Sequence, residues 1–204
     1  APAKKIAGAV ALMLQANPGL TPPLIKAILQ FTAEPLAGSG LVQQGAGMIN
    51  IDGAVALARS LRTDVSSAVL AGSLKAGMPI LGVNKSWNAI VNSSTIGGRK
   101  APWSSLAFVG GNHLASGAAL FTKFQPLYDP TLWWAGNNVR RSVVTYWPGG
   151  GDVKANTYVK SVTELPITST PLITSGVVLA DPLVRNTSLL GRTGLFLPVP
   201  TLAL

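Results

Sequence analysis

The sequence contains no cysteine and only one histidine, and both shortages limit its chemistry. Without cysteine, the chain has no disulfide framework and no thiolate-ligated zinc site. With His113 alone, a transition-metal site has no second imidazole ligand. We therefore expect no metal ion and no cofactor.

Charged residues are also scarce, at 11% of the 204 residues against about 25% in a typical soluble protein. The 16 Lys and Arg outnumber the 7 Asp and Glu, for a net charge of +9. The basic residues are scattered, and the tightest groups are the pairs Lys4-Lys5, Arg99-Lys100 and Arg140-Arg141. Nucleic-acid binders gather such residues into a patch, so this pattern argues against a nucleic-acid partner. An anionic membrane surface remains an alternative contact.

Long hydrophobic runs are missing as well, although hydrophobic residues make up 48% of the chain and argue against disorder. The run from Ile6 to Ala16 is broken by Asn17-Pro18-Gly19, and the run 172–184 contains Asp181 and Pro182. Both fall short of the roughly 20 residues that cross a bilayer, so we expect no transmembrane segment. No signal peptide is recognisable and the first residue is Ala, so we expect a processed or partial product.

The first sixty residues predict three helices. Residues 6–15 carry small and apolar side chains on every side, which predicts a helix buried on every side. Thr21 is expected to cap a second helix with Pro22 in its first turn. Its apolar stripe has helical spacing and consists of Leu24, Ile25, Ala27, Ile28 and Phe31. A turn over 44–47 and a short apolar run over 48–51 follow, and Asp52 is expected to cap a third helix with Arg59 and Arg62 near its end.

These residues resemble the end of the catalytic domain of subtilisin-like serine proteases. Residues 7–22, Ala-Gly-Ala-Val-Ala-Leu-Met-Leu-Gln-Ala-Asn-Pro-Gly-Leu-Thr-Pro, are similar to the V-A-G-A-x-A-L helix and the N-P-x-L-T turn after the family's nucleophile. Residues 25–33 are similar to its next helix. Residues 44–55 are similar to its closing G-x-G-x-x-N strand and helix. The resemblance covers residues 1–62, and Lys4 and Lys5 lie where the family is usually apolar.

The resemblance implies an extracellular or periplasmic α/β endopeptidase with an Asp-His-Ser triad. The serine that the family places before this helix would fall before Ala1, and the D-[ST]-G and H-G-T motifs of the other two residues are absent. We therefore expect no catalytic residue in this chain and no activity of the chain alone. His113 and Ser116 lack a surrounding nucleophile motif, so we expect an ordinary loop histidine.

Residues 63–204 favour strands punctuated by proline and glycine. Residues 142–147 and 156–165 are predicted to form a hairpin with a long loop. The runs 173–180 and 195–204 adjoin or contain prolines, which suits edge strands or extended arms. The predicted class is α+β, with a subtilisin-like helical segment over 1–62 and a β-rich extension over 63–204.

The chain has five tryptophans, of which Trp133, Trp134 and Trp147 are the candidate partner-binding residues. Exposed tryptophans form platforms for sugars or protein partners, whereas buried ones fill cores and interfaces. We expect a protein partner or self-assembly, with the upstream protease chain or other subunits as partners and carbohydrate as a weaker alternative.

Two hypotheses for the function follow. The first is a C-terminal fragment of a secreted subtilisin-like endopeptidase. The alternative is a non-enzymatic structural or accessory subunit of a filament, coat or larger complex, which retains a protease-derived segment and acts by assembly.

Overall fold

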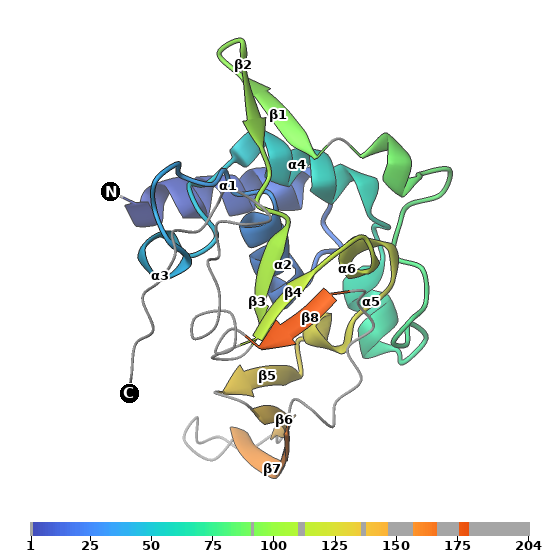
Figure 1. Ribbon diagram of the computed structural model, residues 1–204. Helices are drawn as coiled ribbons and strands as arrows, with labels where there is room; N and C mark the ends of the chain where they lie inside the picture. Colours follow the sequence, from blue (N-terminus) through green and yellow to red (C-terminus); the bar gives the residue numbers. More distant parts are fainter. Residues whose placement is uncertain are drawn as a thin grey trace, which may run out of the picture.

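The computed structural model describes residues 2–90, 92–109, 113–135, 138–146, 157–166 and 176–179 (Figure 1). It combines helices with small antiparallel sheets, which confirms the predicted α+β class.

The helices lie mostly in the first part of the chain. They are α1 (Pro2–Ala16), α2 (Pro22–Phe31), α3 (Leu41–Gln44), α4 (Ile51–Ser60), α5 (Val65–Leu70) and α6 (Ala119–Thr122), with the short 3₁₀ helices η1 (Trp87–Ala89) and η2 (Pro126–Tyr128).

The strands form three separate antiparallel sheets among the described residues. The first pairs β1 (Ser93–Ile96) with β2 (Arg99–Pro102). The second has the order β3–β4–β8, from Leu106–Val109, His113–Ser116 and Gly176–Leu179. The third has the order β5–β6–β7, from Leu132–Ala135, Asn138–Tyr146 and Thr157–Pro166.

Helix α2 begins as its sequence predicts. Thr21 has extended backbone angles, and its Oγ1 accepts a hydrogen bond from the Leu24 N–H at 3.3 Å. The predicted apolar stripe of α2 is buried. The Thr21 hydroxyl also donates to the Tyr128 carbonyl oxygen at 2.7 Å, so the cap ties α2 to η2.

The N-cap of helix α4 lies two residues before the expected one. Asn50, not Asp52, has the extended backbone of a cap, and its Oδ1 accepts a hydrogen bond from the Gly53 N–H at 2.9 Å. Asp52 lies within the first turn, where the helix dipole favours a carboxylate. Gly53 is required, because a Cβ there would lie 2.7 Å from Trp103 Nε1. The short strand expected near residue 48 is a single β-bridge between Met48 and Glu34.

The core surrounds α2 and α4 and contains residues from both predicted segments, 1–62 and 63–204. Its buried residues run from Met13 in α1 to Tyr128 in η2. The ring of Phe31 contacts the rings of Trp87, Trp103 and Phe121 edge to face, with centroids 5.9, 6.4 and 4.7 Å away. A segment of about sixty residues buries a smaller fraction of its surface than a larger domain does, and here residues beyond 62 add to its core.

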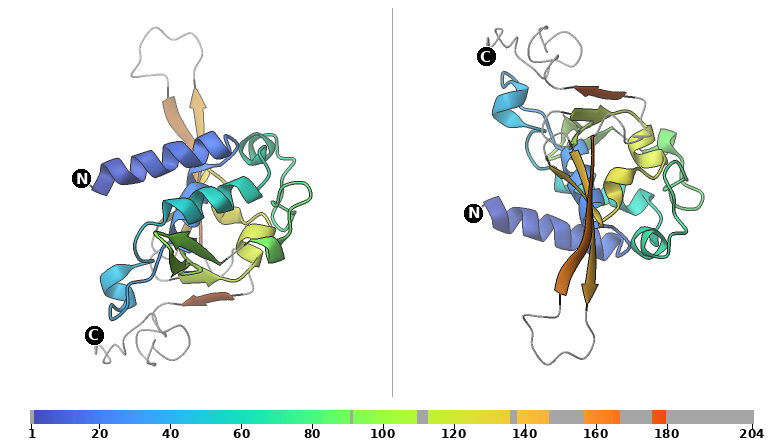
Figure 2. Two further views of the ribbon diagram at one scale, coloured as in Figure 1. Left: turned by 90° about the horizontal axis from the view of Figure 1, so that it is seen from above. Right: turned by 90° about the horizontal axis from the view of Figure 1, so that it is seen from below.

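The predicted hairpin is confirmed by the antiparallel pairing of β6 with β7, and it projects from the body of the molecule (Figure 2). Strand β8, within the predicted run 173–180, pairs with β4 and takes an edge position, as its neighbouring proline suggested. The predicted loop of the hairpin and the run 195–204 lie outside the described residues.

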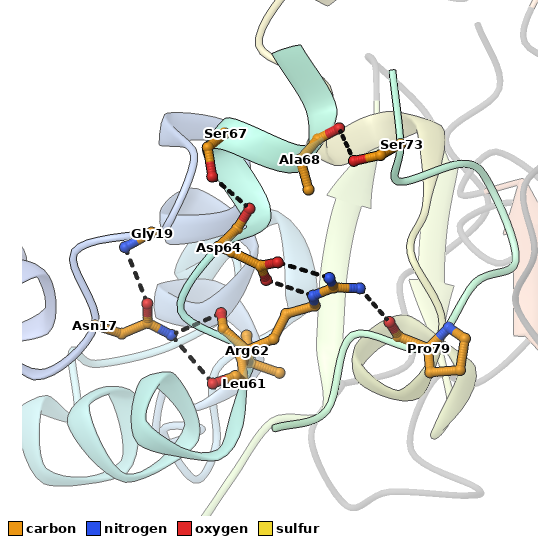
Figure 3. A network of polar contacts seen from close by, with 9 residues as sticks. All are labelled: Asn17, Gly19, Leu61, Arg62, Asp64, Ser67, Ala68, Ser73 and Pro79. Carbon is orange, nitrogen blue, oxygen red and sulfur yellow. Dashed lines mark hydrogen bonds and ion pairs between the residues drawn. The ribbon is translucent and has the colours of Figure 1, made fainter. Parts of the chain in front are cut away.

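A buried asparagine joins the end of α1 to the end of α4 (Figure 3). The Asn17 Nδ2 group donates to the carbonyl oxygens of Ala58, Leu61 and Arg62 at 2.8, 3.4 and 3.3 Å, and Oδ1 accepts from the Gly19 N–H at 3.0 Å. Gly19 is necessary because a Cβ there would lie 1.9 Å from the Thr63 carbonyl oxygen. The network fixes the turn between α1 and α2.

We predict that Asn17→Ala lowers the free energy of unfolding by about 2–3 kcal/mol, because buried backbone groups lose their partner. Chemical denaturation of the two proteins measures this loss. Asn88→Ala on the exposed surface of η1 is the matched control, with an expected change below about 0.5 kcal/mol. Equal effects of the two substitutions would contradict the role given to Asn17.

An ion pair fastens the β1–β2 hairpin to the loop after α2. Both guanidinium Nη groups of Arg99 donate to the Glu34 carboxylate, with Nη2 to Oε2 at 2.9 Å. The hydrogen bonds from Arg99 hold the pKa of Glu34 below its usual value. Glu34 therefore stabilises the fold above its usual pKa, and this contribution is lost as the pH falls through the lowered value.

We predict that Glu34→Gln lowers the thermal unfolding midpoint at neutral pH and that the difference from the unchanged protein shrinks toward pH of about 3. Thermal unfolding followed by circular dichroism over this pH range tests the prediction. The Arg62–Asp64 pair titrates in both proteins and cancels in the difference. A difference that stays constant with pH would rule out the ion pair as its cause.

Candidate functional site

Among the residues that the structure describes, helix α1 is covered on one side only. Its Ala9 and Met13 are 0% exposed, and α4 is the element with which it makes its main contact. Ile6, Leu12 and Leu14 remain 47%, 47% and 38% exposed. The expectation of a helix buried on every side is therefore wrong for the described residues, because the elements that cover α1 lie along one side of it (Figure 2).

The exposed apolar residues of α1 are here called the open face, and they are Ile6, Ala7, Gly8, Ala11, Leu12 and Leu14. A Cβ added at Gly8 would meet no atom within 4 Å, so the described structure contains no steric reason for glycine there. Glycine inside a helix costs about 1 kcal/mol relative to alanine. Small side chains leave the backbone open to close approach by another element, and grouped exposed apolar residues mark interaction sites.

Two lysines accompany the open face. Lys4 and Lys5 are exposed in the first turns of α1, which extends four residues further toward the N-terminus than the sequence predicted. The first turn contains no acidic residue. Within the described part of the chain, the ion pairs are Arg62–Asp64 and Arg99–Glu34, and neither includes these lysines.

The candidate tryptophans belong to other elements than α1. Trp133 and Trp134 lie on β5, where their backbones pair in register with Arg140 and Val139 of β6. Trp147 lies outside the described residues. A role of these three in partner binding stays a prediction. By contrast, Trp103 is buried and its Nε1 donates to Ser94 Oγ at 3.1 Å, as a core tryptophan should.

His113 lies on strand β4, paired in register with Val109 and Leu179, and not in the loop expected from the sequence. Ser116 ends the same strand. Across the residues that the structure describes, no group of three His, Asp or Glu side chains is arranged to hold a metal ion. No helix in the same residues is long and apolar enough to cross a membrane.

The shifted pKa values belong to groups with structural roles. Hydrogen bonds within the two ion pairs lower the pKa values of Glu34 and Asp64 and raise those of their arginine partners. Burial raises the pKa of Tyr128 well above its usual value, and its hydroxyl donates to the Leu120 carbonyl oxygen. These groups hold the core and its hairpins. Among the described helices, α1 exposes three large apolar side chains, which makes its open face the candidate site.

Comparisons of the chain with protein-family models, curated proteins and solved structures found no match.

We predict losses of stability of very different size for substitutions of two consecutive residues of α1. Leu12→Ala removes a half-exposed side chain and lowers the free energy of unfolding by less than about 1 kcal/mol, whereas Met13→Ala in the core lowers it by about 2–5 kcal/mol. Chemical denaturation of both variants measures the contrast. Similar losses for the two would mean that Leu12 is already buried by this chain.

Proposed function

We propose that residues 1–62 are the C-terminal part of the catalytic domain of a secreted subtilisin-like serine endopeptidase, and that residues beyond 62 form an extension packed on it. The triad residues are supplied by a part of the domain outside residues 1–204. The support is the order of the motifs along residues 7–55, together with the open face of α1.

The open face is the observation that carries the proposal. The resemblance implies that the helix after the nucleophile lies inside a parallel α/β sheet, covered on every side. Here α4 is the main neighbour of α1, whose Ala9 and Met13 are buried, and Leu12 and Leu14 on the two flanks of that buried stripe remain in solvent. Fully burying such a side chain contributes about 1.5–3 kcal/mol, so a sheet laid on this face would stabilise the assembled domain.

The proposed contribution of this chain to catalysis is positional. In a Ser-His-Asp triad the serine attacks the scissile carbonyl, the histidine takes its proton and the aspartate orients the histidine. The resemblance implies that the serine directly precedes α1, so the packing of α1 sets where its hydroxyl group lies. The chain alone has no activity under this proposal, and the protein acts outside the cell or in the periplasm.

The open face and the low charge also support a second function, that of a non-enzymatic subunit which assembles with other subunits. The two functions differ in one property of the polypeptide that covers α1. An endopeptidase domain carries a reactive serine, whereas a purely structural partner does not.

We predict that the native protein, isolated with an antibody against this chain, reacts with a fluorophosphonate that labels activated serines covalently. Mass spectrometry should place the label on a serine outside residues 1–204, in the same polypeptide or in one bound to it. The recombinant 204-residue chain and a heat-denatured native sample are the controls and should not be labelled. A native polypeptide that starts at Ala1, has no companion chain and takes up no label would overturn the proposal.

A further inference from the structure

We propose that Asn84 is the attachment site of an N-linked glycan. This inference rests on the secreted location in the proposed function, because N-linked glycans are attached to exported chains, and it adds a covalent modification to the protein surface. It starts from the tripeptide Asn84-Lys85-Ser86, which has the N-x-[ST] sequence of an acceptor with a middle residue other than proline.

The acceptor tripeptide begins in an exposed turn between α5 and η1, at the edge of the molecule (Figure 1). The Lys85 N–H donates to the Gly82 carbonyl oxygen at 3.0 Å, so Val83 and Asn84 are the central residues of the turn. Asn84 has a φ of 60°, in the left-handed region that asparagine tolerates better than most residues do. Asn84, Lys85 and Ser86 are all exposed, so the folded chain presents the whole acceptor to solvent.

The polar groups of the acceptor have no structural task in the described part of the chain. There, the Asn84 carboxamide forms no hydrogen bond with another described residue. Ser86 precedes η1 but its side chain does not cap that helix. Because an acceptor is recognised through its carboxamide and its hydroxyl together, both groups need to be available, and here they are.

Residues 92–94 form a second tripeptide of the same kind, but the fold uses its hydroxyl group. Ser94 is 5% exposed, and its Oγ accepts hydrogen bonds from Asn50 Nδ2 and Trp103 Nε1, both at 3.1 Å. A transferase cannot bind this hydroxyl without opening the core. Residues 186–188 form a third such tripeptide, which lies outside the described residues. The structure therefore favours the first tripeptide over the second.

A glycan at this turn would also cover an apolar side chain. Val83 is 89% exposed, more than other exposed hydrophobic side chains such as Leu70 at 71% and Met48 at 48%. Charged residues that could hydrate the surface make up only 11% of the chain. An N-linked glycan is bulky and solubilising, so it supplies hydration at the position where the turn exposes a valine.

The transfer forms one bond and breaks one. Asn84 Nδ2 attacks C1 of the first sugar of a lipid-pyrophosphate oligosaccharide, which is the co-reactant. The bond between C1 and the phosphate oxygen breaks, and the lipid pyrophosphate leaves with the bonding electrons. Nδ2 gives up one proton to a base of the transferase, and the product is a neutral N-glycosyl amide. This chain supplies only the acceptor group.

We predict that the native protein carries a glycan on Asn84. Peptide-N-glycosidase F removes such glycans and converts the asparagine to aspartate, which takes up heavy oxygen when the reaction runs in heavy-oxygen water. Trypsin then separates the two described acceptors into the peptides 76–85 and 86–99, and mass spectrometry locates the label. Asn88, exposed but outside any acceptor tripeptide, is the internal control and should remain unlabelled.

Secretion of the full 204-residue chain from a eukaryotic cell allows matched variants to be compared. Asn84→Gln and Ser86→Ala should each remove one glycan, whereas Ser86→Thr should keep it, because threonine also provides the hydroxyl group. Asn88→Gln should have no effect. The shift of each variant on a denaturing gel, with and without the glycosidase, measures the loss without any assay of activity.

Two results would overturn this inference. The first is an Asn84 that takes up no heavy oxygen in the native protein. The second is an unchanged number of glycans in the secreted Asn84→Gln and Ser86→Ala variants. The test also separates the two proposals. An unmodified Asn84 beside a fluorophosphonate-labelled serine would refute the glycan alone, whereas a glycan on Asn84 without a reactive serine would refute the protease assignment alone.

Discussion

The buried side chain of Asn17 is the interaction on which the arrangement of the helices depends. Its amide satisfies three carbonyl oxygens around the end of α4 and accepts a hydrogen bond from the turn that begins α2. Because these groups are buried, water does not replace the amide. One short side chain thereby sets the angle at which α1 leaves the core, and with it the direction in which the open face points.

The extension beyond residue 62 covers the N-terminal helices unequally. Trp87, Trp103 and Phe121 surround Phe31 of α2, and the cap of α2 is tied to η2. None of these contacts involves α1, whose main neighbour is α4. The extension therefore completes the core around α2 and α4, whereas Ile6, Leu12 and Leu14 of α1 stay exposed. Within residues 1–62, α2 and α4 therefore build the core, and α1 is the helix that we connect with function.

Capping and turn residues in the sequence correctly predicted where one helix begins and where one hairpin turns. Thr21 before Pro22 predicted the start of α2, and the turn residues at 148–151 predicted the β6–β7 hairpin. The expected cap Asp52 was wrong, because Asn50, a residue of a type equally suited to capping, has the extended backbone angles. His113 lies on a strand because β4 pairs both with the nearby β3 and with β8, more than sixty residues away, and the sequence analysis predicted neither pairing.

The open face was predictable in its composition but not in its exposure. The hydrophobic pattern of residues 6–15 shows that apolar side chains occur all round the helix, yet a pattern does not say which molecule covers them. The structure adds that residues 3–8 of α1 are all exposed, whereas Met13 and Asn17 are buried at its other end. The end that the resemblance brings next to a catalytic serine is thus the end with least support from this chain. Under the function that we propose, a serine needs a fixed position to react, and the cover that α1 lacks here would also hold it there.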